Sequence, residues 1–207
     1  MEEYLVPSKD AVSEFTERRS RFIGHIWVTD TEEEAIERIR AMREKHWDAT
    51  HNVYAYIIRD GATRYSDDGE PQGTAGMPVL EVLRREGLNN VCCVVTRYFG
   101  GILLGAGGLV RAYAKSAKDA VDAAGISVKR IWSRIELACP YSLYDRLVRE
   151  LTACAGTADD TQFGADVCLT VLVPKENTLS FLTRVSDISG GTVRGSVLRE
   201  EYRAFPR

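Results

Sequence analysis

The sequence has little of what marks a membrane-bound or secreted protein. It contains no run of about 18 apolar residues, so it predicts no membrane span. Its first stretch, MEEYLVPSKD, is acidic and mixed rather than basic and then apolar, which predicts no secretory signal. The cysteines are odd in number and form no CxxC pair, so no disulfide framework is predicted. Their apolar neighbours favour buried free thiols in a reducing cytoplasm at Cys92, Cys93, Cys139, Cys154 and Cys168.

Common catalytic and metal-binding motifs are also missing. The patterns GxSxG and GxxxxGK(S/T) and the EF-hand spacing do not occur. His25, His46 and His51 have no accompanying cluster of ligands that would make a zinc site. We therefore predict no catalytic residue, no metal and no cofactor, and keep His51 and Thr96 as candidate site residues beside the motifs described below.

Charge is nearly balanced overall but uneven along the chain. The formal net charge is -3, so the chain as a whole has no positive excess to attract nucleic acid. Residues 66–81 contain four acidic residues and no lysine or arginine, whereas residues 84–118 contain six basic residues against Glu86 alone. An acidic segment thus directly precedes a basic one.

Hydrophobic patterning over the 207 residues predicts an α+β protein of two domains, residues 1–132 and 133–207. The first domain is predicted to have strands at 20–29, 51–60, 63–68 and 89–99, and helices after Thr31, at 77–87 and at 109–125. Helical spacing places Ile36 and Val110 on the buried faces of the first and last of these helices.

The second domain follows the β-α-β-β-α-β order of a ferredoxin-like fold. Its predicted elements are a strand at 133–140, a helix at 141–156, strands at 157–164 and 165–174, a helix at 175–189 and a strand at 191–202. The first strand could also run from Ile126 to Pro140 and be shared by both domains.

A run of glycines precedes the helix predicted at 109–125. Five glycines lie between Gly100 and Gly108, and glycine lets a ligand approach bare backbone N–H groups. A helix start offers unpaired N–H donors and the positive end of a dipole, which suits a phosphate. The predicted phosphate- or nucleic-acid-binding residues are Arg97, Tyr98, Gly105, Gly107, Gly108, Arg111, Lys115 and Lys118. The alternatives are a tight turn between packed elements and a solvated basic face.

The acidic segment SDDGEPQGTAG (66–76) is predicted to be a loop with three carboxylates in four residues. Clustered oxygens could hold a magnesium ion against a phosphate, or form a turn and cap the next helix. A basic partner for the loop is a third possibility. The candidate residues of this acidic-loop site are Tyr65, Ser66, Asp67, Asp68, Glu70, Gln72 and Thr74.

Four aromatic residues lie beside these loops in the sequence. Aromatic side chains interleaved with arginines can stack on bases, although aromatics at strand ends are commonly part of the core. The four are Tyr65, Tyr98, Phe99 and Tyr113.

Two long stretches carry a resemblance. At YSDDGEPQGTAGMPVLEVL (65–83) and VVTRYFGGILLGAGGLVRAYAKS (94–116) the sequence resembles the IMPACT family of proposed translation regulators, in its bacterial branch. RRSRFIG (18–24) and DATHNVYAY (48–56) add to the likeness, which extends over essentially the whole chain.

The resemblance implies a fold for each domain. The N-terminal domain would be similar to the ribosomal-protein superfamily that includes domain IV of elongation factor G and the GHMP kinases. The C-terminal domain would be similar to domain V of elongation factor G. In GHMP kinases a glycine-rich loop before a helix holds nucleotide phosphates, which suits the interpretation of residues 105–109. The resemblance also implies that eukaryotic relatives act through a protein partner by means of an additional domain, and because we find no counterpart of that domain in this sequence, their mechanism is not expected here.

Three functions remain open from the sequence. The first is a non-enzymatic, translation-linked protein that binds RNA or the ribosome through the glycine loop and the basic helix face. The second is a metal-dependent enzyme acting on a nucleotide or a small phosphorylated substrate. The third is a protein-binding module whose acidic loop meets a basic partner.

Overall fold

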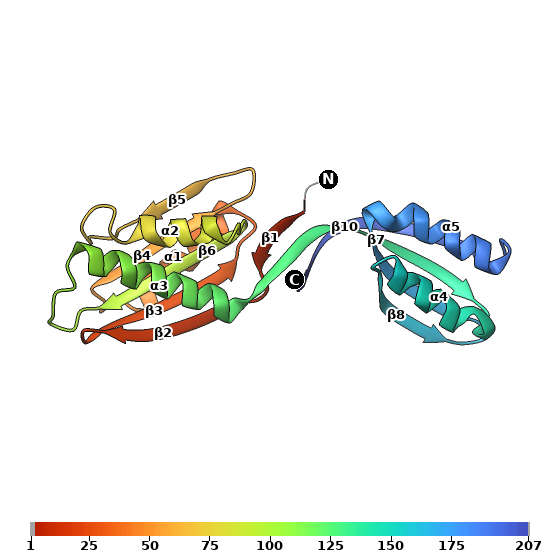
Figure 1. The fold of residues 1–207 in the computed structure, drawn as a ribbon, viewed down its shortest axis with the longest axis horizontal. Helices are drawn as coiled ribbons and strands as arrows, with labels where there is room; N and C mark the ends of the chain where they lie inside the picture. The colour runs from red at the N-terminus through yellow and green to blue at the C-terminus, as the bar shows by residue number, and fades with distance from the viewer. Residues whose placement is uncertain (1–2, 207) are drawn as a thin grey trace. The chain divides into compact units, whose positions relative to one another are not determined.

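A computed structural model describes residues 3–206, and these divide into two compact units. One unit comprises Tyr4–Val128 with the residues from Ala204 onward, and the other comprises Lys129–Arg203 with Glu3. The division falls within a single long strand, β7 (Ile126–Cys139), which supports the alternative of one shared strand (Figure 1). No helix among residues 3–206 is long and apolar enough to cross a membrane.

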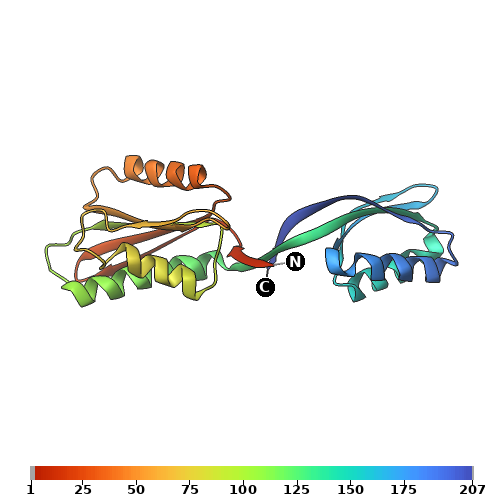
Figure 2. The same cartoon turned by 90° about the horizontal axis from the view of Figure 1, so that it is seen from above.

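The N-terminal unit is built around an antiparallel sheet with strand order β2-β3-β6-β4-β5. The strands of this sheet are β2 (Ala11–Glu17), β3 (Ser20–Val28), β4 (His51–Ile57), β5 (Thr63–Ser66) and β6 (Val91–Tyr98), while β1 (Tyr4–Pro7) lies outside it and pairs with β7. The helices of this unit are α1 (Glu32–Lys45), α2 (Gly76–Arg85) and α3 (Ala106–Ala124). Helix α1 covers one face of the sheet, and α2 and α3 cover the other (Figure 2).

The central strand β6 is buried on both faces, as its continuous apolar run predicts. Because side chains alternate along a strand, Cys93, Val95 and Arg97 face α2 and α3, whereas Thr96 and Tyr98 face α1. This alternation decides which of the candidate residues can meet.

Helix α1 begins as the sequence predicts. Thr31 Oγ1 accepts a hydrogen bond from the Glu34 amide, and Glu34 reaches back to the Asp30 amide, so both free donors are satisfied. The expectation that Ile36 is buried was wrong, because the helix packs through Ala35 and Ile39 and leaves Ile36 54% exposed.

Helix α3 begins three residues earlier than predicted, at Ala106 within the glycine run. It packs on the sheet through one stripe of large side chains and alanines, which includes Leu109, Tyr113 and Ala117. Val110 lies outside that stripe and is 39% exposed, so its predicted burial was also wrong.

The hairpin between β2 and β3 was not predicted. Glu17 pairs with Ser20, so the turn consists of Arg18 and Arg19 alone, with φ angles of 43° and 64°. Two-residue hairpin turns with positive φ usually carry asparagine and glycine, and two arginines give no such sequence signal.

The C-terminal unit has the β-α-β-β-α-β order predicted from the sequence. Its elements after β7 are α4 (Tyr141–Ala153), β8 (Thr157–Phe163), β9 (Val167–Pro174), the short 3-10 helix η1 (Lys175–Asn177), α5 (Thr178–Ser189) and β10 (Gly195–Pro206). Strand β7 pairs with β9 and β10, and β9 pairs with β8. Both helices lie on one face of this sheet, over a core that includes Ile135, Leu147 and Phe181 (Figure 2).

All five cysteines are free, but they are not all buried. Cys168 is exposed because it alternates with the core residues Val167 and Leu169 and points to the face of the sheet without helices. The prediction of burial was therefore wrong for this one cysteine and is confirmed for the other four.

Candidate functional site

A buried ion pair lies under the end of the sheet where α3 begins. Arg97 Nη1 on β6 lies 2.5 Å from Glu70 Oε1 in the acidic loop, and both side chains are about one-twentieth exposed. Arg97 Nη2 donates to Ser20 Oγ at 3.3 Å, and the guanidinium lies over the rings of Phe22 and Phe99. Glu70 was assigned to a different candidate site from Arg97 on the basis of sequence, and the fold brings the two together.

Tyr113 on α3 supplies a second donor to Glu70 Oε1. Its hydroxyl donates to Glu70 Oε1 at 2.8 Å, and its ring meets the edge of Phe22. Burial, followed by the charge of Glu70, raises the pKa of Tyr113 above its ordinary value, so the phenol stays protonated and acts as a donor. Glu70 Oε1 therefore accepts from two buried donors.

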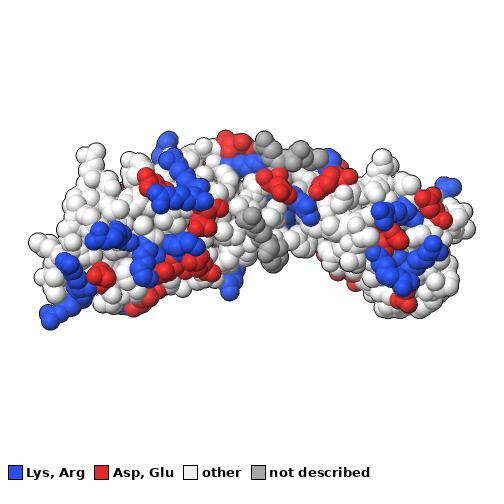
Figure 3. All heavy atoms as spheres, viewed as in Figure 1, with Lys and Arg blue, Asp and Glu red and all other residues white. Residues whose placement is uncertain are grey.

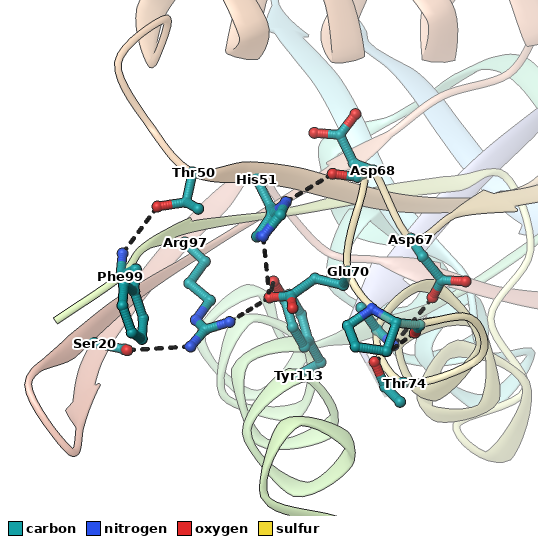
Figure 4. A network of polar contacts seen from close by, with 12 residues as sticks. Ser20, Thr50, His51, Asp67, Asp68, Glu70, Thr74, Arg97, Phe99 and Tyr113 are labelled. Atoms are coloured by element: carbon teal, nitrogen blue, oxygen red, sulfur yellow. Dashed lines mark hydrogen bonds and ion pairs between the residues drawn. The ribbon is translucent and has the colours of Figure 1, made fainter. Parts of the chain in front are cut away.

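His51 is placed by strand register. It is directly opposite Arg97 in the pairing of β4 with β6, so both side chains face α3. Its Nδ1 lies 2.7 Å from the carbonyl oxygen of Asp68, which can only accept, so Nδ1 carries a proton. Its Nε2 then faces Glu70 Oε1 at 3.8 Å (Figure 4).

These groups form the polar side of a pocket of about 380 Å³, which we call the Glu70 pocket. Its polar lining includes His51, Glu70 and Arg97, and its other walls are mostly apolar. The apolar walls come mainly from the chain leading into α3 and include Phe99, Leu103, Leu104 and Leu109. Gly105 and Ala106, at the start of α3, also line this pocket.

The start of α3 has no side-chain cap. Gly105 precedes the helix with φ of 73°, and the first helical hydrogen bond runs from the Leu109 amide to the Gly105 carbonyl. The amides of Ala106, Gly107 and Gly108 therefore have no acceptor from a side chain in the described part of the chain. Such a helix end can bind an anion.

The glycine loop is pressed against the β2–β3 turn. A Cβ on Gly100 would lie 2.0 Å from the carbonyl carbon of Arg19, so only glycine permits this contact. Arg18 Nη1 in turn donates to the Leu103 carbonyl at 3.3 Å. Arg18 and Arg19 thus lie beside the glycine loop although about 85 residues separate Arg18 from it in sequence. They are the basic residues that the sequence-based prediction missed.

The predicted basic helix face differs from residue to residue. Arg111 folds back toward the start of its own helix, where a Cβ on Gly107 would lie 3.4 Å from Arg111 Nη1. Lys115 pairs with Asp119, and Lys118 pairs with Asp122 and Glu86. Among residues 3–206 no hydrogen bond or ion pair engages Arg111, so it is the member of this face whose charge stays available. A smaller pocket of about 270 Å³ lies next to Arg18, Arg111 and Lys115.

Tyr98 and Thr96 lie on the opposite face of the sheet from the Glu70 pocket. Tyr98 hydroxyl lies 3.0 Å from His46 Nδ1 and donates to Asp48, and Thr96 donates to Asn52. The sequence-based prediction grouped Tyr98 with Arg97, and strand alternation separates their side chains.

The acidic loop is held by internal hydrogen bonds. Asp67 accepts from the amides of Gly73, Ala75 and Gly76 and so caps α2 from outside the helix. Thr74 Oγ1 donates to the Pro71 carbonyl at 2.6 Å. This matches the turn-and-cap interpretation of the loop.

Asp68 serves another set of partners. Its carboxylate accepts from the Asn52 amide and pairs with Arg43 at 2.7 Å, and Ser66 Oγ accepts from its amide. The carboxylates of Asp67, Asp68 and Glu70 thus point to different partners (Figure 4). No cluster of three or more histidine, cysteine or acidic side chains suited to a metal occurs among the described residues.

The remaining loop residues contribute less to the pocket. Gln72 is exposed, and Tyr65 is 42% exposed at the end of β5. A Cβ on Gly76 would lie 2.9 Å from the Tyr65 ring, so Tyr65 packs against the first turn of α2. Of the four aromatics considered, Phe99 alone lines the Glu70 pocket with an exposed ring.

The fold and the site define a class: a two-unit α+β protein whose N-terminal unit joins a buried ion pair to an uncapped, glycine-rich helix start. The chain belongs to the IMPACT family. The family model of the Impact N-terminal domain matches residues 18–121, and that of a domain of unknown function, DUF1949, matches residues 137–192. The resemblance stated from the sequence is thus confirmed.

Bacterial relatives match along nearly the whole chain. IMPACT family member YvyE of Bacillus subtilis is 36% identical over 190 residues, which is 91% of this chain and 88% of the relative. IMPACT family member YigZ of Escherichia coli is 33% identical and covers 97% of this chain and 100% of the relative. A crystal structure of a hypothetical protein, 32% identical, aligns with a TM-score of 0.61 over 96% of this chain and 98% of its own.

Proposed function

We propose that the N-terminal unit binds RNA, free or in the ribosome, by its phosphates, in a translation-linked role. The binding surface, which we call the arginine edge, consists of the amides of residues 106–108 and the side chains of Arg18, Arg19 and Arg111. The observation that carries the proposal is an uncapped helix start beside an arginine that no described residue neutralises.

The physical support is that two sources of positive charge meet at one place. The first turn of α3 supplies N–H donors and the positive end of the helix dipole. The arginines supply mobile charge and forked donors suited to phosphate oxygens. On the face of this unit drawn in Figure 3 many basic and acidic side chains lie next to each other, and Lys115 and Lys118 beside the arginine edge have acidic partners.

A likeness to elongation factor G is part of the same proposal. The β-α-β-β-α-β order of the C-terminal unit is consistent with domain V of that factor, and the mixed N-terminal unit is consistent with domain IV. Such a likeness supports a role linked to translation. The likeness rests on the resemblance in sequence and on the element order.

The other two functions have less support from the described side chains. The metal-dependent enzyme needs Asp67, Asp68 and Glu70 to converge, and each has a different internal partner. The protein-binding module needs acidic side chains on the loop that are free to meet a partner. The carboxylates of Asp67, Asp68 and Glu70 already bond to other groups of this protein. Phosphate binding at α3 is the function that the geometry supports best.

Fluorescence anisotropy with a labelled single-stranded RNA, together with cosedimentation with ribosomes, tests this function. We expect binding that weakens linearly in log affinity with log salt, and a loss of about tenfold or more for Arg111→Glu, because a phosphate contact becomes a repulsion. Arg149→Glu on α4 of the other unit makes the same charge change at an exposed helix position and should leave affinity unchanged. Salt-independent binding, or equal losses for both variants, would contradict the proposal.

A further inference from the structure

Phosphate binding on the arginine edge leaves the Glu70 pocket unexplained. Glu70 is 8% exposed, and both of its buried donors bond to Oε1, so Oε2 forms no hydrogen bond with a described residue. Arg97 is 5% exposed and buries its Nε–H without an acceptor. Glu70, which lines the pocket, thus keeps one carboxylate oxygen as an unused acceptor for a ligand or a water molecule.

The apolar walls of the pocket are unusually exposed for their residue types. Phe99 is 45% exposed and Leu103 is 79% exposed, and both lie on the chain between β6 and α3. The Arg97 guanidinium lies 5.5 Å from the Phe99 ring, so the exposed aromatic wall of the pocket lies directly beside the Arg97–Glu70 pair. A volume of about 380 Å³ is at the lower end of small-ligand pockets and suits a single base with its sugar.

We propose that the Glu70 pocket binds one nucleoside monophosphate unit, with its phosphate on the α3 amides and its base between Phe99 and Leu103. An amino group on the base donates to Glu70 Oε2. This inference rests on the proposed function for the phosphate position, and adds the base and its chemical class. The unit can come from an unpaired nucleotide of RNA or from a free nucleotide, since both present the same groups.

The surroundings favour a nucleotide over another anion with an apolar body, such as a peptide C-terminus. Gly105 and Ala106 line the pocket at the start of the same helix whose next turn carries Arg111. Leu104 lines both this pocket and the smaller one beside Arg18 and Arg111. The phosphates on either side of a bound nucleotide would therefore lie near Arg18 and Arg111. A peptide C-terminus carries a single carboxylate and would leave these arginines without a partner.

The base preference gives a sharp test. Adenine, cytosine and guanine carry an exocyclic amino group. Uracil carries none, and its N3–H donor is flanked by two carbonyl oxygens that a carboxylate repels. We expect titration calorimetry to show AMP, CMP and GMP binding at least about fivefold more tightly than UMP, because an unpaired buried carboxylate costs affinity. The corresponding nucleosides and inorganic phosphate alone should bind at least about tenfold more weakly than the monophosphates.

Variants separate the pocket from the arginine edge. Phe99→Ala should weaken AMP binding about tenfold, the range for loss of one stacked base, without changing the salt dependence of RNA binding. Phe163→Ala removes a 63%-exposed phenylalanine from the other unit and is the matched control, with no effect expected. Circular dichroism and melting temperature show whether each variant keeps its fold, and Phe99→Leu, which keeps an apolar wall but loses the ring, should also weaken AMP binding.

Each outcome bears on one proposal or the other. If RNA binds and depends on Arg111 but no monophosphate binds or competes, the pocket inference is wrong and the proposed function survives. If monophosphates bind with the expected preference but RNA and ribosomes do not, the pocket is a free-nucleotide site and the proposed function is wrong. Equal affinities for UMP and AMP, or displacement by an apolar tripeptide but not by AMP, would overturn the inference.

Discussion

The two units of this protein place their charges in opposite ways. The N-terminal unit covers its sheet with helices on both faces and buries the pair Arg97–Glu70 beneath them. The C-terminal unit leaves one face of its sheet without a helix, and that side carries a network of Arg134, Asp159, Glu201 and Arg203 with partly exposed side chains. A charge in water is tolerated almost anywhere, whereas a buried charge needs a dedicated partner.

The comparison teaches where a site is to be sought. The charges of this network pair with one another at partly exposed positions. The buried pair lines a pocket, lies beside an exposed aromatic ring and leaves Glu70 Oε2 without a donor among the described residues. The costly arrangement is therefore the better indicator of function.

The largest effect should come from breaking the buried pair. Arg97→Met leaves Glu70 charged and buried, so we expect a loss of about 3–5 kcal/mol in the free energy of unfolding, measured by urea denaturation. Arg203→Met removes an arginine that also has two acidic partners, but its side chain is 36% exposed and the expected loss is at most about 1 kcal/mol. Similar losses of unfolding free energy for the two variants would show that the burial of an arginine does not determine how much it contributes to stability.

Acid should weaken the N-terminal unit more than its neighbour, because all three histidines lie in it. Burial, and then the charges of Lys45 and His46, lowers the pKa of His25 to about 4, below its ordinary value of 6.5. The unfolded state therefore binds a proton first as pH falls. Stability present above pH 6.5 is lost between about 6.5 and 4, on the order of 3 kcal/mol, with no further change below.

Hydrogen–deuterium exchange, which follows the two units separately, measures this difference between pH 7 and pH 4. His25→Phe should remove most of the pH dependence from the strands around β3, while the exchange of the C-terminal unit stays the same. A C-terminal unit that loosens as much as the N-terminal one would argue against the assignment to His25.

The smallest expected effect concerns two glycines, one packed against a hairpin turn and one at a hairpin tip. Gly100→Ala forces a methyl group to within 2.0 Å of the Arg19 backbone, so the loop must move, at a cost of about 2 kcal/mol. At Gly164, the hairpin tip of the C-terminal unit, a Cβ would meet the Asp166 carbonyl at 3.6 Å, which is ordinary contact, and Gly164→Ala should cost less than about 1 kcal/mol.

The same pair of variants tests the arginine edge. Because Gly100 holds the loop against the β2–β3 turn, Gly100→Ala should also weaken RNA binding by displacing Arg18 and Arg19. Thermal melts and anisotropy measure the two effects. RNA affinity that is unchanged in a destabilised Gly100→Ala protein would show that the contact serves packing alone.

Much of the fold could be predicted from local signals. Three such signals depend only on residues close together in the sequence. They are the apolar run of β6, the cap at Thr31 and the helical spacing of α3. The errors at Ile36 and Val110 arose because helical spacing defines a stripe but not which edge of it meets the sheet. The candidate site was predicted only in pieces.

The family and the β-α-β-β-α-β order of the second unit follow from the sequence by itself, since motifs and periodicity are local properties. Tertiary structure alone decided that Glu70 joins Arg97 and Tyr113, and that Arg18 and Arg19 lie beside the glycine loop. The reason is physical. Strand order and register decide which side chains meet across a sheet, and a close backbone contact needs the whole fold to bring the two segments together.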